Sequence, residues 1–370
     1  MKRNIWIGIG IVVIVALAIV LVVTQTKREP QEIKIGAVLP LTGDVAKYGE
    51  EARNGIELAL EDIKDLKIKV VYEDDQGTVN GAINAFNKLV ESAKVPIIIG
   101  PMYSSTALAV APLGEKKKVV IFSPSASSPE LTKAGDYFFR NWPSDVYEGG
   151  EMARFAYNNL NLKTIAILSV NLDYGVGLIK VFEKVFKSLG GQILTIEYYD
   201  QGATDFRTQL SKIKSLNPEA IYLPGYYTEI GLILRQAKEM GLKTKFLSCV
   251  GFDNPKVLEI AGNAAEGVIF ARPYYDPESK NPMVKTFVER FRQRFGRDPG
   301  IYAAHSYDAL KIVVTAIKKG GYSADGIKSA LYSIKNFPGV TGNTSFDENG
   351  DVEKPIQIMK VKHGSFVRYE

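Results

Sequence analysis

Residues 33–39 read Ile-Lys-Ile-Gly-Ala-Val-Leu, and an amphipathic stretch at residues 48–64 follows them. A short run rich in β-branched residues indicates a buried strand, and apolar residues three or four positions apart indicate a helix. The same alternation continues along the chain. It predicts further strands at 68–73, 96–100 and 119–123 and further helices at 79–93 and 104–116. This β-α-β-α order is typical of a parallel sheet that is covered by helices on both faces.

A second sheet of the same kind is predicted after the pattern pauses at residues 138–143. Its strands are expected at 164–170, 192–197, 220–224 and 245–249, with helices at 174–189, 206–215 and 228–240. The tail differs, because three helical patterns follow one another without strands, at 282–295, 302–319 and 324–333. The last strands are predicted at 343–346, 356–362 and 366–368, in an antiparallel arrangement.

The sequence therefore predicts an α/β fold of two open, Rossmann-like lobes with parallel sheets. The tail helices fit as additions to the first sheet, and the last strands return to the second. The first lobe is expected to comprise residues 32–142 and 274–337, and the second lobe residues 143–273 and 338–370. The chain would cross between the lobes three times, near 141–144, 272–275 and 337–342. Several crossings make a hinge, and the cleft between such lobes is where ligands bind.

A hydrophobic segment precedes the lobes. Lys2 and Arg3 are followed by nineteen uncharged residues, Ile5–Val23. As a helix, this run would span about 28 Å, close to the thickness of the hydrocarbon core of a membrane. We interpret residues 1–31 as a membrane anchor that is retained, with a cleaved signal segment as the alternative. Both a retained anchor and a cleaved signal segment would place the rest of the chain outside the cytoplasm.

The composition argues against several classes of function. The net charge is +5, of which the first thirty residues contribute +3 (four cationic side chains against Glu29), so nucleic-acid binding is not expected. One cysteine and two histidines supply neither a disulfide nor a cysteine-cluster zinc site. The Walker A, dinucleotide-binding and nucleophile-elbow motifs do not occur in the sequence. We therefore predict a protein that is not an enzyme and that needs no cofactor and no metal.

Loops rich in hydroxyl groups follow two neighbouring strands of the first predicted sheet. Residues 100–106 read Gly-Pro-Met-Tyr-Ser-Ser-Thr and open a helix, and residues 123–129 read Ser-Pro-Ser-Ala-Ser-Ser-Pro. Backbone N–H groups at the start of a helix, with hydroxyl groups beside them, suit an anionic ligand group. Each loop by itself is also a good helix cap or turn, so a structural role is the alternative.

Several short motifs occur together in an order and spacing that a known family shares. They include residues 35–43 (IGAVLPLTG), 72–75 (YEDD), 98–101 (IIGP), 173–175 (DYG), 231–241 (GLILRQAKEMG) and 346–351 (FDENGD). Through these motifs the chain resembles the leucine/isoleucine/valine-binding protein family, the type I periplasmic solute-binding proteins of ABC importers. The resemblance covers nearly everything after residue 31.

The resemblance implies that the two lobes close by a hinge around a small solute and then dock on the permease subunits of an ABC importer. The expected solute carries a carboxylate and is a branched-chain or other amino acid. The resemblance also implies that serine hydroxyl groups bind the carboxylate and that tyrosine rings close over the solute. The expected ligand-binding residues are Ser104, Ser105, Ser125, Ser127, Tyr48, Tyr103, Trp142, Tyr174, Tyr226 and Gly251.

Position 250 departs from the family pattern. Amino-acid-binding members carry a glutamate there that pairs with the ligand ammonium group, whereas this chain has Val250. A buried ammonium group without a counter-charge is costly. An amino-acid ligand would therefore need Asp145 or Asp253 as its partner, and the alternative ligand is an organic acid or amide without an amine. A ligand-sensing ectodomain that uses the same cleft is the alternative function.

Overall fold

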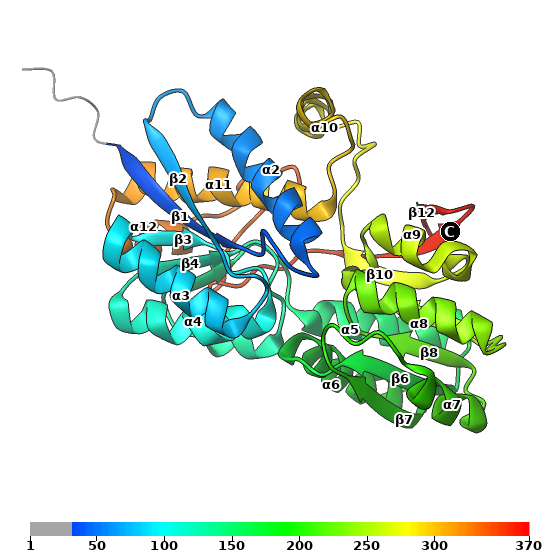
Figure 1. The fold of residues 1–370 in the computed structure, drawn as a ribbon. Coiled ribbons are helices and arrows are strands. Elements are labelled where there is room, and N and C mark those ends of the chain that lie inside the picture. Colours follow the sequence, from blue (N-terminus) through cyan, green and yellow to red (C-terminus); the bar gives the residue numbers. More distant parts are fainter. Residues whose placement is uncertain (1–31, 370) are drawn as a thin grey trace, which may run out of the picture.

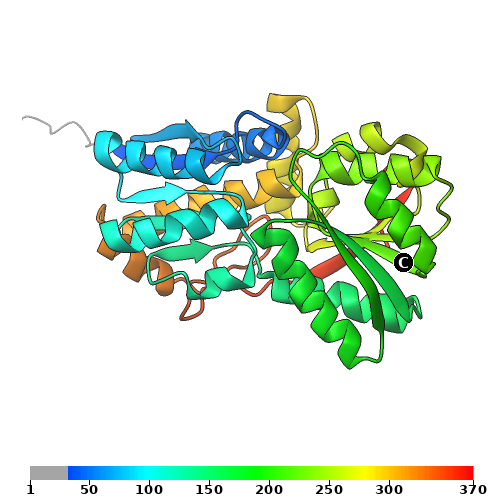
Figure 2. The ribbon, with the colours of Figure 1, turned by 60° about the horizontal axis from the view of Figure 1, so that its bottom comes forward.

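The computed structural model describes residues 32–369 and shows two α/β lobes side by side (Figure 1, Figure 2). Each lobe is built around its own sheet, and most strands in both sheets are parallel. The predicted fold class is confirmed. The hydrophobic run at 5–23 lies outside the described residues, so its prediction as a membrane anchor stays a prediction.

The first lobe contains a five-stranded parallel sheet in the order β2-β1-β3-β4-β5. Its strands are β1 (Ile33–Leu39), β2 (Ile68–Asp74), β3 (Ile97–Ile99), β4 (Val120–Ser123) and β5 (Phe138–Arg140). Its helices are α2 (Ala46–Asp62), α3 (Val79–Lys88), α4 (Ser104–Lys117), α10 (Pro282–Phe295), α11 (Ile301–Gly320) and α12 (Ala324–Tyr332). The three helices of the tail pack with the first lobe, where α10 and α11 contact α2 and α12 contacts α11.

The side chains of successive residues in each strand point to opposite faces of this sheet, and both faces are buried. In β1, Ala37 and Leu39 belong to the hydrophobic cluster shared with α2, α11 and α12, whereas Val38 belongs to the cluster shared with α3 and α4. This alternation follows from the two-residue period of a strand. Because both faces are covered, all three side chains are fully buried.

The second lobe contains a seven-stranded sheet in the order β12-β11-β10-β9-β8-β6-β7. Its strands are β6 (Thr164–Val170), β7 (Gln192–Tyr199), β8 (Ala220–Leu223), β9 (Lys245–Ser248), β10 (Ile269–Pro273), β11 (Ile356–Lys362) and β12 (Ser365–Arg368). Its helices are α5 (Asp145–Arg154), α6 (Asp173–Ser188), α7 (Arg207–Leu216), α8 (Tyr227–Glu239) and α9 (Lys256–Ala261).

Short turns of π- or 3₁₀-helix occur in both lobes, at Leu89–Ala93, Pro129–Lys133, Phe155–Asn159, Val250–Phe252 and Gly262–Ala265.

Two strands of the structure are not evident from the sequence pattern. β5 has only three residues, and β10 ends in Arg272-Pro273, which reads as a connection rather than as a strand. β10 nevertheless lies inside the second sheet, parallel to β9 and antiparallel to β11. It therefore joins the parallel part of the sheet to the antiparallel strands of the tail.

The strand predicted at 343–346 is wrong. Thr344 makes a single bridge with Phe337, and the residues around it are irregular. Phe346 packs instead against Phe122 and Phe139 in the core of the first lobe, with ring centroids 5.8 and 5.6 Å away. Burial of the Phe346 ring therefore replaces the strand pairing predicted at 343–346.

The third crossing lies further along the chain than the expected 337–342. Asp308 of α11 accepts hydrogen bonds from the N–H groups of Val340 and Thr341, each at 2.9 Å, and so holds this segment to the first lobe. Asp351 is still bound there, through Arg140 of β5. The chain then passes to β11 of the second lobe over residues 352–355. The first two crossings follow β5 and β10, as the sequence predicts.

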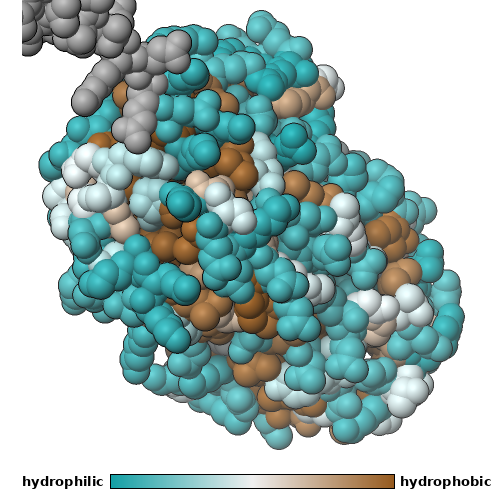
Figure 3. Space-filling view, turned by 60° about the vertical axis from the view of Figure 1, so that its left-hand side comes forward, coloured by the Kyte–Doolittle hydropathy of each residue, from teal (hydrophilic) through white to brown (hydrophobic). Residues whose placement is uncertain are grey.

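The face of the molecule shown in Figure 3 is mostly hydrophilic, with hydrophobic residues between the polar ones. Within residues 32–369, the helices are too short or too polar to cross a membrane. No group of three or more histidine, cysteine or acidic residues is arranged to hold a metal ion in this part of the chain.

Candidate functional site

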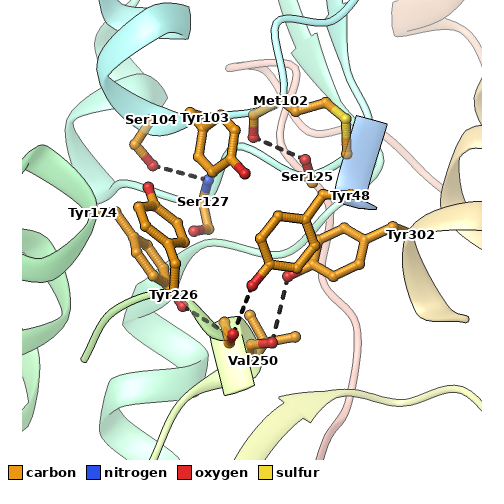
Figure 4. Close-up of a pocket in the computed structure, with 11 residues that line it drawn as sticks. Tyr48, Met102, Tyr103, Ser104, Ser125, Ser127, Tyr174, Tyr226, Val250 and Tyr302 are labelled. Atoms are coloured by element: carbon orange, nitrogen blue, oxygen red, sulfur yellow. Dashed lines mark hydrogen bonds between the residues drawn. The ribbon is translucent and has the colours of Figure 1, made fainter. Parts of the chain in front are cut away.

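The candidate site is a pocket between the two lobes, at the carboxyl ends of the parallel strands (Figure 4). Hydrogen bonds join the lobes across it. The Tyr48 hydroxyl of α2 donates to the Gly251 carbonyl oxygen at 2.6 Å, and the Tyr302 hydroxyl of α11 donates to the Val250 carbonyl oxygen at 3.4 Å. The lobes are therefore closed on the pocket. The residues that line it are Tyr48, Met102, Tyr103, Ser104, Ser125, Ser127, Tyr174, Tyr226, Val250, Gly251 and Tyr302.

The two hydroxyl-rich loops of the first lobe meet at this pocket. The Ser104 hydroxyl, on the first residue of α4, accepts hydrogen bonds from the N–H groups of Ser127 (3.4 Å) and Ser128 (3.1 Å). Ser125 donates from its hydroxyl to the Met102 carbonyl oxygen at 2.8 Å. The first N–H groups of a helix have no acceptor in the preceding turn. The start of α4 therefore presents N–H and O–H donors to the pocket, which is a suitable environment for a carboxylate.

Aromatic rings make the other walls. Tyr174 and Tyr226 of the second lobe are stacked, with ring centroids 5.5 Å apart, and Tyr226 meets Tyr103 edge-on at 4.9 Å. Tyr48 and Tyr302 of the first lobe lie together at 4.6 Å. Burial raises the pKa of all five phenols well above the usual value, so they stay neutral hydrogen-bonding groups at neutral pH.

The pocket is small in this closed conformation. The open space inside it is about 30 Å³, enough for one or two water molecules. A solute the size of an amino acid needs several times this volume. Entry of such a solute therefore requires the lobes to separate and the tyrosine side chains to shift.

Buried carboxylates lie behind the pocket wall. Asp145 is the first residue of α5 and is fully buried, and neither of its carboxylate oxygens has a hydrogen-bond partner among the described residues. Burial raises the pKa of Asp145 to about 7, although the nearby Ser127 hydroxyl and the Arg140 guanidinium act to lower it. Glu148, one helical turn further, accepts a hydrogen bond from the Val250 N–H at 2.8 Å. Burial and the neighbouring Asp145 raise its pKa as well.

Asp253 is paired with Arg272, with Oδ2 and Nη1 2.6 Å apart. Of the two candidates from the sequence, Asp145 is therefore the carboxylate without a partner in the described chain, and Asp253 is already neutralised.

Most of the residues expected from the sequence are brought together here, namely Tyr48, Tyr103, Ser104, Ser125, Ser127, Tyr174, Tyr226 and Gly251. Four expected residues lie outside the lining. Ser105 lies one residue beyond Ser104 in α4, and Trp142 stacks behind Tyr302. Asp145 is fully buried outside the lining, and Asp253 lies outside it in an ion pair with Arg272.

Sequence reasoning misses Met102, Tyr302 and Glu148. Tyr302 and Glu148 lie inside helical patterns where no local motif marks them. Met102 lies within the hydroxyl-rich loop 100–106, and its position in that loop is the signal that could have identified it as a lining residue.

The chain forms two α/β lobes with mostly parallel sheets. Three crossings join the lobes, and the lobes are closed on a pocket. This arrangement defines a solute-binding protein of the type I periplasmic class. The family model described as "Periplasmic binding protein" matches residues 32–365. The chain belongs to this family.

Two relatives in the same family are named for branched-chain amino acids. The chain is 30% identical to the leucine-, isoleucine-, valine-, threonine- and alanine-binding protein of Pseudomonas aeruginosa over 87% of each chain. A crystal structure of a leucine-binding protein from Thermotoga maritima is 35% identical, with a TM-score of 0.88 over 91% of this chain and 98% of that one. The resemblance to the leucine/isoleucine/valine-binding proteins is thereby confirmed.

A third relative was solved with a different kind of solute. It is a solute-binding protein of an ABC transporter from Rhodopseudomonas palustris, in complex with 3,4-dihydroxybenzoic acid. It is 27% identical, with a TM-score of 0.83 over 91% of this chain and 95% of that one. Relatives with the same fold thus differ in whether the solute carries an amine.

Proposed function

We propose that this chain captures a branched-chain or other small amino acid outside the cytoplasm and delivers it to the permease of an ABC importer. The observation that carries the proposal is the donor cluster of Ser104 and the loop 125–128, which faces tyrosine rings across a closed pocket. The donors suit the carboxylate of the solute, and the rings suit its apolar part. The hydrophobic run at 5–23 supports anchoring of the protein at the membrane.

An organic acid without an amine is the second candidate solute. The aromatic walls favour it, because flat rings pack well against stacked and edge-on tyrosines. The unpartnered Asp145 behind the wall opposes it, because only a solute with an amine offers a cation to this buried carboxylate. We therefore place the amino acid first.

Calorimetry with leucine and valine, compared with their des-amino acids, tests the proposed solute class. We expect the amino acids to bind more tightly. Small-angle scattering of the same samples should show a smaller radius of gyration with solute, because the hinge closes the lobes. Tighter binding of the des-amino acids would contradict the amino-acid assignment. Failure of amino acids and small carboxylates alike to bind would contradict the proposed function itself.

Replacing Ser104 by alanine should weaken leucine binding by about 1–3 kcal/mol, or about 5- to 150-fold in the dissociation constant, because a charged carboxylate loses a hydrogen-bond donor. Isothermal titration calorimetry measures this change. Ser105→Ala is the matched control, since the adjacent hydroxyl is outside the pocket lining and has no partner among residues 32–369. Equal affinities of the two folded variants would place the carboxylate elsewhere.

A further inference from the structure

Two carboxylates occupy one face of the first turn of α5. Asp145 and Glu148 are three residues apart, which places them side by side on a helix. The side chains of both residues are almost entirely buried, with 0% and 2% of each residue exposed. Two acidic groups this close and this deeply buried are costly unless something compensates their charge.

Glu148 is connected directly to the floor of the pocket. Its Oε1 accepts the N–H of Val250 at 2.8 Å, and Val250 and Gly251 are pocket-lining residues. The same loop is held from the pocket side, where the Tyr174 hydroxyl accepts the Gly251 N–H at 3.3 Å. Glu148 thus lies on one side of a two-residue floor and the solute space lies on the other.

Asp145 is connected to the opposite wall. Its backbone N–H donates to the Ser127 carbonyl oxygen at 2.8 Å, and Ser127 lines the pocket. Both oxygens of its carboxylate are free of partners within residues 32–369. Because Ser127 also lies at the donor cluster, Asp145 lies behind the wall at the end of the pocket where the carboxylate and α-ammonium groups of an amino acid are expected.

The cations near Asp145 and Glu148 are already paired with other carboxylates. Within the described chain, Arg140 of β5 is the cation whose charge lowers the pKa of Asp145, and this guanidinium is already paired with Asp351. Asp253, which acts on Glu148, is paired with Arg272.

The other titratable groups that face the pair are four phenols and one thiol. Burial raises the pKa of each of them, so they stay neutral: Tyr174, Tyr222, Tyr226, Tyr302 and Cys249. Among residues 32–369, the cation that acts on the pair is thus already bound to another carboxylate.

We propose that Asp145 and Glu148 act as one counter-charge for the amine of the solute, and that they replace a carboxylate at position 250. This inference rests on the proposed function and makes it more specific, because it selects solutes with a cationic amine next to the carboxylate. Asp145, which lies behind the lining beside Ser127, is a positioning residue that supplies negative charge from that side. Glu148 acts through the Val250–Gly251 floor and is a positioning residue that shares the negative charge.

The expected pH dependence follows from the sharing of a proton. Two adjacent buried carboxylates do not both ionise readily. Burial raises the pKa of Asp145 to about 7 and raises the pKa of Glu148 as well, so the pair is protonated in the solute-free protein at pH 6. A cationic amine stabilises the ionised form, and binding of an amino acid then releases that proton. Leucine affinity should therefore rise as the pH increases through about 7, the pKa of Asp145. Affinity for 4-methylpentanoic acid, its des-amino analogue, should fall over the same range.

The central test uses Glu148→Gln and Asp145→Asn with leucine as the probe at pH 7. Glutamine keeps an oxygen that can accept the Val250 N–H, so Glu148→Gln removes charge while it preserves the hydrogen bond. We expect each variant to bind leucine at least about ten-fold more weakly, with unchanged or tighter binding of 4-methylpentanoic acid. Glu151→Gln is the matched control, because Glu151 is exposed on the same helix and should leave both affinities unchanged.

Two further measurements separate charge from structure. Calorimetry of the wild-type protein in buffers of different ionisation enthalpy should show proton release on leucine binding at pH 6. Adding Val250→Glu to Glu148→Gln should restore part of the leucine affinity, because it returns a carboxylate to the floor. Wild-type leucine affinity in Glu148→Gln and in Asp145→Asn, or leucine binding without proton release, would overturn the inference and leave the proposed function intact. Failure of the wild-type protein to bind any amino acid would overturn both the inference and the amino-acid assignment, and failure to bind small carboxylates as well would overturn the proposed function.

Discussion

Replacing Arg140 by methionine is expected to lower the free energy of unfolding by about 3–5 kcal/mol, the usual cost of leaving one member of a buried ion pair alone. The Arg140 side chain is fully buried. Its Nε donates to Asp351 Oδ1 at 2.6 Å and its Nη2 donates to Asp351 Oδ2 at 2.8 Å. It also donates to the Ser128 carbonyl oxygen at 2.9 Å. Without it, the Asp351 carboxylate would keep the Thr132 hydroxyl as its side-chain donor in the described chain.

This ion pair joins the first crossing to the third. Arg140 ends β5, immediately before the first crossing, and Asp351 precedes the passage to β11. Urea unfolding measures the loss, and Arg154→Met is the control, since the Arg154–Glu151 pair is exposed and should contribute less than about 1 kcal/mol. A change below about 1 kcal/mol for Arg140→Met would show that the ion pair adds little to stability.

Replacing Trp142 by alanine is expected to cost about 3–5 kcal/mol of folding stability, as for other large aromatic side chains removed from a core. Trp142 lies in the first crossing and is 1% exposed. It stacks on Tyr302 with ring centroids 5.3 Å apart and an interplanar angle of 13°, and it contacts His305 at 4.4 Å. The cavity left by alanine would remove support from the pocket tyrosine.

The Trp142→Phe variant separates the packing of Trp142 against Tyr302 from a direct contact between Trp142 and the solute. A phenyl ring keeps most of the packing, so this variant should lose less stability than alanine. Its leucine affinity should stay close to that of the wild type, because Trp142 lies behind the lining residues rather than among them. Thermal unfolding and calorimetry measure the two quantities. A stable Trp142→Phe protein with much weaker binding would make Trp142 a solute-binding residue after all.

The sequence predicts the serine side of the pocket well, and the reason is local. Ser104 and Ser127 come shortly after two strands that pair in parallel, and such strands bring their carboxyl ends to one edge of the sheet. Residues that are separated by a strand and a helix therefore meet without any knowledge of the second lobe. The side chain of Ser105 points elsewhere because a helix directs neighbouring residues about 100° apart.

The acidic pair behind the pocket is not predictable in the same way. Glu148 and Val250 are 102 residues apart, and their hydrogen bond forms only once α5 and the loop after β9 are packed together. The family resemblance implies a glutamate at position 250, where this chain has Val250, and the sequence offers Asp145 and Asp253 as equal substitutes. The structure separates them, because Arg272 pairs with Asp253 while Asp145 stays without a partner among residues 32–369.

The sequence by itself determined the two βα rhythms, the class of fold and the hydroxyl-rich edge of the first sheet. These features follow from periodicity and from the direction of parallel strands, which are properties of short segments. Only the tertiary structure decided that Phe346 leaves the strand pattern for the core of the first lobe, that the third crossing comes after Asp351, and that Glu148 meets the pocket floor. Each of these depends on which distant group is available to bury a ring or to neutralise a charge, and that choice is made only when the whole chain is packed.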